Sequence, residues 1–516
     1  MKGAVAAGHP LTAEAGARIL SEGGNAVDAC IAAGFASWVV ESPLAGPGGG
    51  GFMLVHRAGD RSARLLDFFV AAPGLGRRAR RPARLEQVDV DFDGATSQVF
   101  SIGSASVAVP GTAAGFEAAH RAHGSVRWRR LVEPAVELAR GGFELTREQA
   151  HLHLLLDAIL RHTEEGRRVY RATAAGARVR LPDLAGTLEL IAAEGAEAVY
   201  RGDLAAALLR HLRETGGEVT RSDLDAYRVI TRRPVVARFR DHEVVSNPPP
   251  SSGGVLIAYG LRLLHRLGVG EPGSAAAIAR LVEVGREQAR ARADAAFARD
   301  LNRGGLAGRL ASDESARRAL ARIRRRLVAP VEAAARGTTH VSVVDAAGNA
   351  ASLSASLGSG SGVIVPGTGM HLNNMLGEHD LLPSGAGARP GRRLTSMMAP
   401  SLVLSEGRPR LVVGSAGSVR LRGAILQIVV NVVGHGDAVG EAIDRPRVHA
   451  EGLQVHCEGG HDAAELDRLE ESGYEVVRWR ERNLFFGGVS AVELRADGTL
   501  AAAGDPRRGG DGVVVL

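Results

Sequence analysis

The sequence has almost no lysine and few aromatic residues. Lys2 is its only lysine, and Phe, Trp and Tyr make up 4% of the 516 residues. The formal net charge of +6 therefore comes from arginine, which is spread along the whole chain. The densest basic runs, Arg77–Arg84 and Arg322–Arg326, lack the interleaved aromatic residues that single-strand recognition needs. We expect solvated loop or helix faces there and no nucleic-acid partner.

Cysteine and long apolar runs are also scarce. Cys30 and Cys457 give neither a disulfide framework nor the paired spacing of a zinc site, so we expect buried free thiols and no metal. The longest apolar runs, Ala29–Val40 and Ala424–Val433, are too short to span a bilayer, and residues 1–16 lack the apolar core of a signal peptide. These features predict a cytoplasmic protein with no membrane contact, although removal of a leader stays open as an alternative.

One glycine-rich stretch matches a nucleotide-binding pattern only in its letters. Gly46–Gly51 reads GxGxxG, but strand formers follow it, whereas the dinucleotide fingerprint opens a helix. A P-loop is excluded because the lysine that it requires is absent. The sequence therefore predicts no cofactor.

The pattern of apolar residues changes near residue 337. Segments with helical periodicity lie at 11–40 (broken at Gly23-Gly24), 113–215, 255–267 and 275–329. Strand formers gather at 52–56, 63–69 and 235–245. From residue 338 onward strands alternate, with helices expected at 422–433 and 463–472. We therefore predict an α+β protein with a helix-rich part, 1–337, and a strand-rich part, 338–516.

The strand-rich part begins with a predicted β-hairpin. Its two arms, Thr338–Asp345 and Ala350–Leu357, alternate polar and apolar residues, and Gly348 supplies the left-handed residue that a short loop needs. This loop sets a register in which Thr338 faces Ser356. Facing Cβ atoms are about 4.5 to 5.5 Å apart, so the two hydroxyls can interact.

Spacing alone leaves two interpretations of this hairpin open. In the first, it is half-exposed, and its Ser and Thr side chains simply face water. In the second, Thr338 is a nucleophile. A threonine hydroxyl needs a neighbouring base, and an α-amino group, with a pKa of roughly 7.7 to 8.0, is such a base when threonine is the first residue of its chain. Cleavage after Gly337 would create that amino group.

Several motifs, in order along nearly the whole chain, resemble the γ-glutamyltranspeptidase family of N-terminal-nucleophile hydrolases. They are Gly23–Asp28, Gly48–Met53, Ser106–Gly111, Pro248–Gly254, Thr338–Asp345, Leu372–Asn374, Leu394–Met397 with Pro400, Gly414–Gly417 and Asp444–His449. The resemblance implies a four-layered αββα fold and a precursor that cuts itself between Gly337 and Thr338. The large subunit, 1–337, and the small subunit, 338–516, would stay associated, and pairing of two such heterodimers is left open.

The resemblance also implies catalytic roles. Thr338 matches the nucleophile, and Ser356 matches the hydroxyl residue that hydrogen-bonds to its amino group. Gly417 and Ser418 match the pair whose backbone N–H groups stabilise the oxyanion, although the second residue is usually glycine. Such a preorganised donor is worth about 3 to 4 kcal/mol.

Substrate-binding roles follow from the same motifs. Thr395 and Ser396 match a pair of serines that holds the substrate carboxylate, and Glu378 matches an acidic residue that pairs with the substrate amino group. We expect a small amide or peptide-like substrate.

Three positions depart from the family pattern. Members that bind glutamyl donors carry an arginine that grips the α-carboxylate, and Phe69 stands at that position. The Asn and Gln that contact glutamate are replaced by Gly358 and Met375. Losing one bidentate charge pair would cost several kcal/mol of donor binding.

The resemblance implies an amidohydrolase or acyltransferase that cleaves a γ-glutamyl-like amide through an acyl-enzyme on Thr338. The departures favour two alternatives with another substrate. One is an acylase for a more apolar donor, and the other is an intracellular tailoring enzyme of specialised metabolism, including hydrolysis of a carbon–carbon bond beside an oxalyl-like group. A further alternative is a non-catalytic relative that acts as a binding protein, but the presence of Thr338 and Ser356 favours an enzyme.

Overall fold

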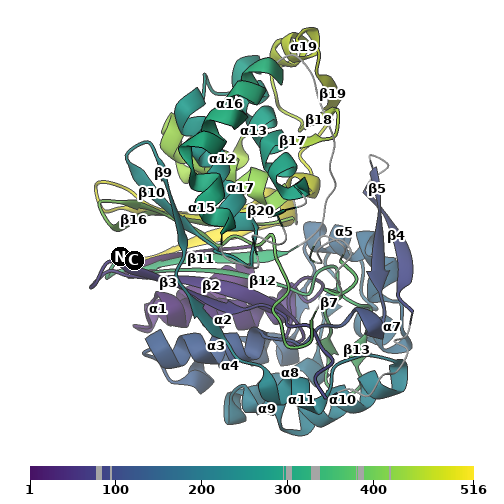
Figure 1. Ribbon diagram of the computed structural model, residues 1–516. Helices are drawn as coiled ribbons and strands as arrows, with labels where there is room; N and C mark the ends of the chain where they lie inside the picture. Colours follow the sequence, from purple (N-terminus) through teal and green to yellow (C-terminus); the bar gives the residue numbers. More distant parts are fainter. Residues whose placement is uncertain are drawn as a thin grey trace.

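Two β-sheets stack face to face at the centre of the computed structural model, and helices cover both outer faces (Figure 1). The structure describes residues 1–76, 84–92, 96–294, 296–297, 301, 305–326, 338–378, 381, 389–417 and 420–516. This layering is the αββα arrangement that the family resemblance implies.

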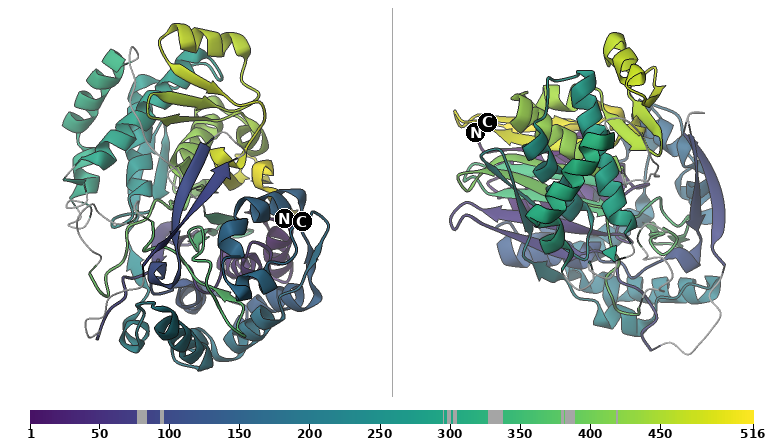
Figure 2. Two further views of the ribbon diagram at one scale, coloured as in Figure 1. Left: turned by 90° about the vertical axis from the view of Figure 1, so that its right-hand side faces the viewer. Right: turned by 45° about the horizontal axis from the view of Figure 1, so that its top comes forward.

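The first sheet has seven antiparallel strands among the described residues, in the order β22-β1-β11-β12-β2-β3-β8. Their bounds are β22 (Asp511–Val515), β1 (Gly3–Ala7), β11 (Thr339–Asp345), β12 (Ala350–Ser356), β2 (Gly50–Arg57), β3 (Ser62–Phe68) and β8 (Ile230–Arg232). Because β1 pairs with β22, the two termini of the chain lie side by side (Figures 1 and 2).

The second sheet has six antiparallel strands in the order β21-β20-β16-β15-β10-β9 within the described ranges. They are β21 (Leu500–Gly504), β20 (Gly488–Leu494), β16 (Arg408–Ala416), β15 (Ser401–Ser405), β10 (His242–Ser246) and β9 (Val235–Phe239). The expected strand region at 235–245 is thus a hairpin at the edge of this sheet.

Helices α1 (Pro10–Ser21), α2 (Ala26–Val40) and α4 (Trp128–Gly141) lie below the first sheet in Figure 1. All residues of α2 are buried, as expected for a helix that is apolar on every side. The predicted break before α2 is correct: the Asn25 side chain caps the helix by accepting hydrogen bonds from the backbone N–H groups of Val27 and Asp28.

Helices α12 (Gly253–Leu267), α13 (Ala275–Ala293), α16 (Asp313–Arg326) and α17 (Leu421–Val429) lie above the second sheet in Figure 1. The helix expected at 422–433 is divided, because α17 passes into a π-helical segment, Val430–His435. The predicted helix at 463–472 is α19 (Ala463–Glu471).

Other sequence predictions can be checked directly. Both cysteines are buried free thiols. Arg322, in one basic run, forms an ion pair with Glu287 across 2.6 Å, whereas residues 77–83 of the other run lie outside the described residues. No helix in the described part of the chain has the length and apolar character needed to cross a membrane.

Candidate active site

Thr338 directly precedes β11, at the open end of the predicted hairpin. The structure pairs Thr339 with Ala355 and His340 with Ser354, which is the predicted register. Continued by one residue, this register sets Thr338 opposite Ser356, and their exposed fractions are only 3% and 1%. Gly348 in the loop has φ +79°, so the left-handed conformation inferred from the sequence is confirmed.

The hairpin is buried on both faces, so the interpretation in which its hydroxyls face water is wrong. Every residue of β11 and β12 is buried. Val341 and Leu353 pack into the core formed with α2, and Ser342 on the other face donates a 3.0 Å hydrogen bond to the Ser490 carbonyl in β20. A local alternation of polar and apolar residues reveals two faces, but it does not reveal that a second sheet covers the polar one.

His340 organises the polar face beneath Thr338. Its Nδ1 shares a 2.8 Å hydrogen bond with the Ser354 hydroxyl, and its Nε2 shares a 3.0 Å bond with the Ser342 hydroxyl. The ring packs against Gly414 of β16, where a Cβ atom would lie 2.2 Å from Cε1 of the histidine. Burial lowers the pKa of His340 to about 3, because desolvation disfavours the charged ring.

This shift predicts that acid weakens the fold through His340. Below the ordinary pKa of 6.5 the unfolded chain binds a proton that the folded protein refuses, so stability falls as the pH drops from 6.5 towards 3. At pH 5 the loss is about 2 kcal/mol. Urea unfolding gives the free energy of unfolding at pH 7 and at pH 5. Between these two pH values, His340→Gln should lose about 2 kcal/mol less than the wild type. Equal losses of stability in the two proteins would contradict the lowered pKa of His340.

Two charged residues that the sequence analysis did not identify lie beside the start of β11. The Thr339 hydroxyl donates a 2.6 Å hydrogen bond to Glu41, which also accepts one of 2.9 Å from Thr12. Burial raises the pKa of the Glu41 carboxyl. Arg508 donates a 2.8 Å hydrogen bond from Nη1 to the Thr338 carbonyl. The sequence carries no signal for Arg508, because it is one arginine among many.

Gly417, the first of the two expected oxyanion residues, follows β16 directly. It has φ +116°, and a Cβ atom there would lie 2.9 Å from Cα of Gly487, so a side chain is excluded on both grounds. Its carbonyl accepts a 3.1 Å hydrogen bond from the Arg420 backbone. Ser418 and Gly337 lie outside the described residues.

Phe69 and Met375 belong to the apolar core that includes residues of both sheets and of the helices above the second sheet. Their exposed fractions are 1% and 2%, and the Phe69 ring stacks on Phe52 with centroids 5.4 Å apart. The carboxylate two residues before Phe69 already has partners: Asp67 forms ion pairs with Arg232 and Arg393 at 2.7 and 3.1 Å.

Gly358 lies between Ser356 and Glu378. Its N–H donates a 2.8 Å hydrogen bond to the Ser356 hydroxyl. A Cβ atom at Gly358 would lie 2.0 Å from Oδ1 of Asn374 and 2.7 Å from Oε1 of Glu378, and its φ is +76°. The structure therefore brings Ser356 and Glu378 close together, and a larger residue at 358 would displace Asn374.

The hydroxyls of Thr395 and Ser396 contact the protein backbone. Thr395 donates a 2.6 Å hydrogen bond to the Leu381 carbonyl, and the Ser396 hydroxyl accepts one of 3.1 Å from the Met398 N–H. Their role in binding a substrate stays a prediction. Among the residues described, no three His, Cys, Asp or Glu side chains gather as they would around a metal ion.

Comparisons with known proteins agree with this architecture. The family model for gamma-glutamyltranspeptidase matches residues 12–515. The acylase ACY 1 proenzyme of Pseudomonas sp. (strain SE83) is 33% identical over all of this chain and 94% of its own length. The glutathione hydrolase proenzyme of Escherichia coli (strain K12) is 30% identical over 98% of this chain and 90% of its own. In fold, the chain is similar to a cephalosporin acylase from Bacillus halodurans, with a TM-score of 0.84, 24% identity, and coverage of 99% and 95%. This chain belongs to the γ-glutamyltranspeptidase family, whose members are enzymes.

Proposed function

We propose that this protein is a self-cleaving amide hydrolase that uses Thr338 as its nucleophile and acts on an acyl donor other than glutamyl. The observation that carries the donor proposal is the burial of Phe69 in an apolar core, at the position where glutamyl-binding relatives carry an arginine.

In the first proposed step, the Thr338 hydroxyl attacks the Gly337 carbonyl, and the peptide bond becomes an ester. Water hydrolyses the ester and leaves fragments 1–337 and 338–516, the second with a free α-amino group. This amino group can accept the proton of the Thr338 hydroxyl during attack on a substrate amide. Ser356, opposite Thr338 in the hairpin register, is suited to orient the amino group.

In the second proposed step, Thr338 attacks the substrate carbonyl, and the amine leaves with a proton. Water then hydrolyses the acyl-enzyme and releases the acid. Gly417 and Ser418 are our candidates for the backbone donors that stabilise the oxyanion. Gly417 directly follows β16, and its conformation excludes a side chain.

Three positions support an acyl group that is less polar than glutamyl. Phe69 and Met375 are buried apolar side chains at positions where a guanidinium and an amide are expected, and Gly358 has no side chain. Without the arginine, the α-carboxylate of a glutamyl group would lose its charged partner, and hydroxyls such as those of Thr395 and Ser396 would offset less of its desolvation. The ACY 1 acylase relative, which matches this chain along its whole length, supports the same choice.

A panel of 4-nitroanilides tests the donor proposal on the cleaved protein. We expect butyryl, hexanoyl or phenylacetyl anilide to exceed γ-glutamyl anilide in kcat/KM by about 100-fold or more, which corresponds to roughly 3 kcal/mol. A γ-glutamyl anilide that is turned over as well as the best apolar one would overturn the donor proposal. The masses of the purified fragments test the cleavage proposal separately.

A further inference from the structure

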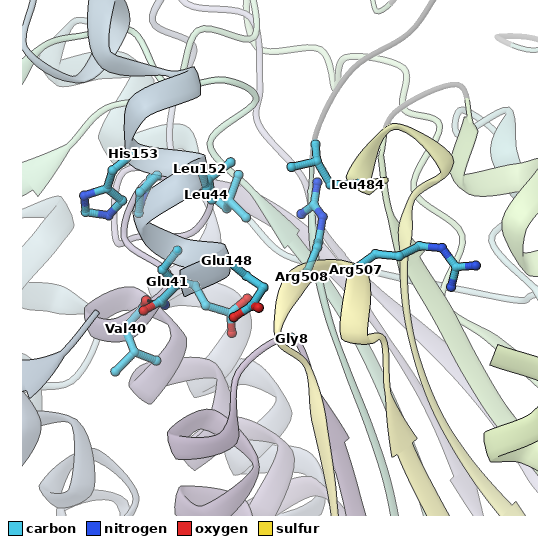
Figure 3. A pocket seen from close by; sticks show the side chains of 12 residues that line it. Gly8, Val40, Glu41, Leu44, Glu148, Leu152, His153, Leu484, Arg507 and Arg508 are labelled. Atoms are coloured by element: carbon cyan, nitrogen blue, oxygen red, sulfur yellow. Dashed lines mark hydrogen bonds between the residues drawn. The ribbon is translucent and has the colours of Figure 1, made fainter. Parts of the chain in front are cut away.

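A pocket opens beside the start of β11, on the side of β1 and β22. Its apolar wall includes Leu44, Leu152 and Leu484, and its polar residues include Glu41, Glu148 and Arg508 (Figure 3). Arg508 joins the pocket to the candidate nucleophile, because its Nη1 donates a hydrogen bond to the Thr338 carbonyl.

Arg508 and its neighbour Arg507 have different surroundings. Arg507 forms ion pairs with both Glu458 and Asp505 in the protein interior. Arg508 has no carboxylate within 4.0 Å among the described residues, and its buried Nε has no hydrogen-bond partner there. In Figure 3 its guanidinium points away from Glu41 and Glu148 and towards Leu484.

The electrostatics around Arg508 favour an added anion. Burial lowers the pKa of the Arg508 guanidinium, because desolvation disfavours its charge, while Glu41 and Asp505 oppose this effect. The hydroxyls of Thr12 and Thr339 already donate to Glu41, and burial raises the pKa of that carboxyl. A carboxylate bound at Arg508 would gain a charge-assisted hydrogen bond.

The pocket and the expected acyl site lie on opposite sides of Thr338. In the first sheet, β11 has β12 as one neighbour and β1 as the other. Ser356 ends β12 and leads to Gly358 and Glu378, whereas Gly8 of the pocket follows β1. An amide bound at Thr338 has an acyl half and an amine half, which must extend in different directions.

We propose that Arg508 binds a carboxylate carried by the amine half of the substrate, at the mouth of this small pocket, whose cavity volume is about 30 Å³. The substrate class is then an N-acylated amine that bears a carboxylate, such as an N-acyl amino acid or aminobenzoate. This inference rests on the proposed function, which it extends from the acyl half to the leaving group.

Matched anilides test this assignment. For the best acyl group of the panel above, kcat/KM is measured for the 4-nitroanilide and for the 3-carboxy-4-nitroanilide, which differ only by a carboxylate on the amine half. We expect the cleaved wild type to favour the carboxylated substrate, and Arg508→Met to reduce this ratio by about 10- to 100-fold. Arg508→Lys should keep part of the preference, since it keeps the charge.

The ratio separates binding from structural damage, because a poorly folded variant loses both substrates equally. Arg140→Met is a control for net charge, since Arg140 is an exposed residue that pairs with Glu189, and it should leave the ratio unchanged. An unchanged ratio in Arg508→Met would overturn the proposal. The assignment to the amine half would fail if Arg508→Met instead reduced the preference for glutaryl over pentanoyl 4-nitroanilide.

A binding measurement keeps this inference distinct from the proposed function. Equilibrium dialysis of the cleaved protein with 5-amino-2-nitrobenzoate, the carboxylated amine product, should give tighter binding than with 4-nitroaniline, and Arg508→Met should remove the difference. If no anilide is turned over, the proposed function fails, yet dialysis still decides the role of Arg508. Equal binding of both amines by the wild type would overturn that role.

Discussion

Thr338→Ala is expected to leave the protein as one uncut chain and to abolish amide hydrolysis. The substitution removes the hydroxyl that would attack both the Gly337 carbonyl and the substrate, so no ester can form at residue 338. We expect turnover to fall by at least about 10⁴-fold. A denaturing gel and the intact mass report cleavage, and release of nitroaniline reports turnover. Thr338→Ser keeps a hydroxyl and should still cut, more slowly.

The adjacent Thr339 offers a matched control for this experiment. Its hydroxyl is committed to Glu41 at 2.6 Å, and its side chain lies on the opposite face of β11 from that of Thr338. Thr339→Ala should therefore still cut between Gly337 and Thr338, at a cost of about 1 to 2 kcal/mol in stability from the lost hydrogen bond. Normal fragments from Thr338→Ala, or a cut displaced by one residue, would show that the nucleophile is misassigned.

Phe69→Arg is expected to destabilise the protein severely and not to create γ-glutamyl hydrolysis. The ring of Phe69 is 1% exposed and stacks on Phe52, so a guanidinium there would lie in an apolar core. Asp67, two residues earlier in the chain, already forms ion pairs with Arg232 and Arg393. Loss of the ring and burial of an unpaired charge together should cost about 4 kcal/mol or more.

The midpoint of urea unfolding measures this cost, and Phe69→Leu is its control. An apolar replacement should lose about 1 to 2 kcal/mol, because it keeps most of the buried area. If Phe69→Arg folded with wild-type stability and hydrolysed γ-glutamyl 4-nitroanilide, the site would need only this arginine to accept glutamyl. Our account of the apolar donor site would then be wrong.

The hairpin shows how far the sequence determines the candidate site. Alternation along its arms and the glycine at 348 are local features, and together they fix the register that sets Thr338 opposite Ser356. The covering of its polar face by the second sheet depends on residues far along the chain, such as Ser490. Local periodicity could not predict that covering.

Other elements show the same limit. The five residues of β1, Gly3–Ala7, are small and do not alternate between polar and apolar, so their pattern does not predict this strand between β22 and β11. Arg508 reaches Thr338 across 170 positions of the chain. Its neighbour Arg507 has the same side chain but forms ion pairs with Glu458 and Asp505, and only the folded structure distinguishes the two arginines.

The order of strands in the sheets has a consequence for a protein cut at residue 338. In the first sheet, β1 from the leading fragment lies between β22 and β11 from the trailing one, and β12 pairs with β2 across the same divide. In the second sheet, β10 and β15 join the fragments again. Cleavage would therefore interrupt the chain without dividing the fold into two separate units. Neither piece can be withdrawn, exchanged or refolded alone without dismantling both sheets, so the pair should separate only when the whole molecule unfolds.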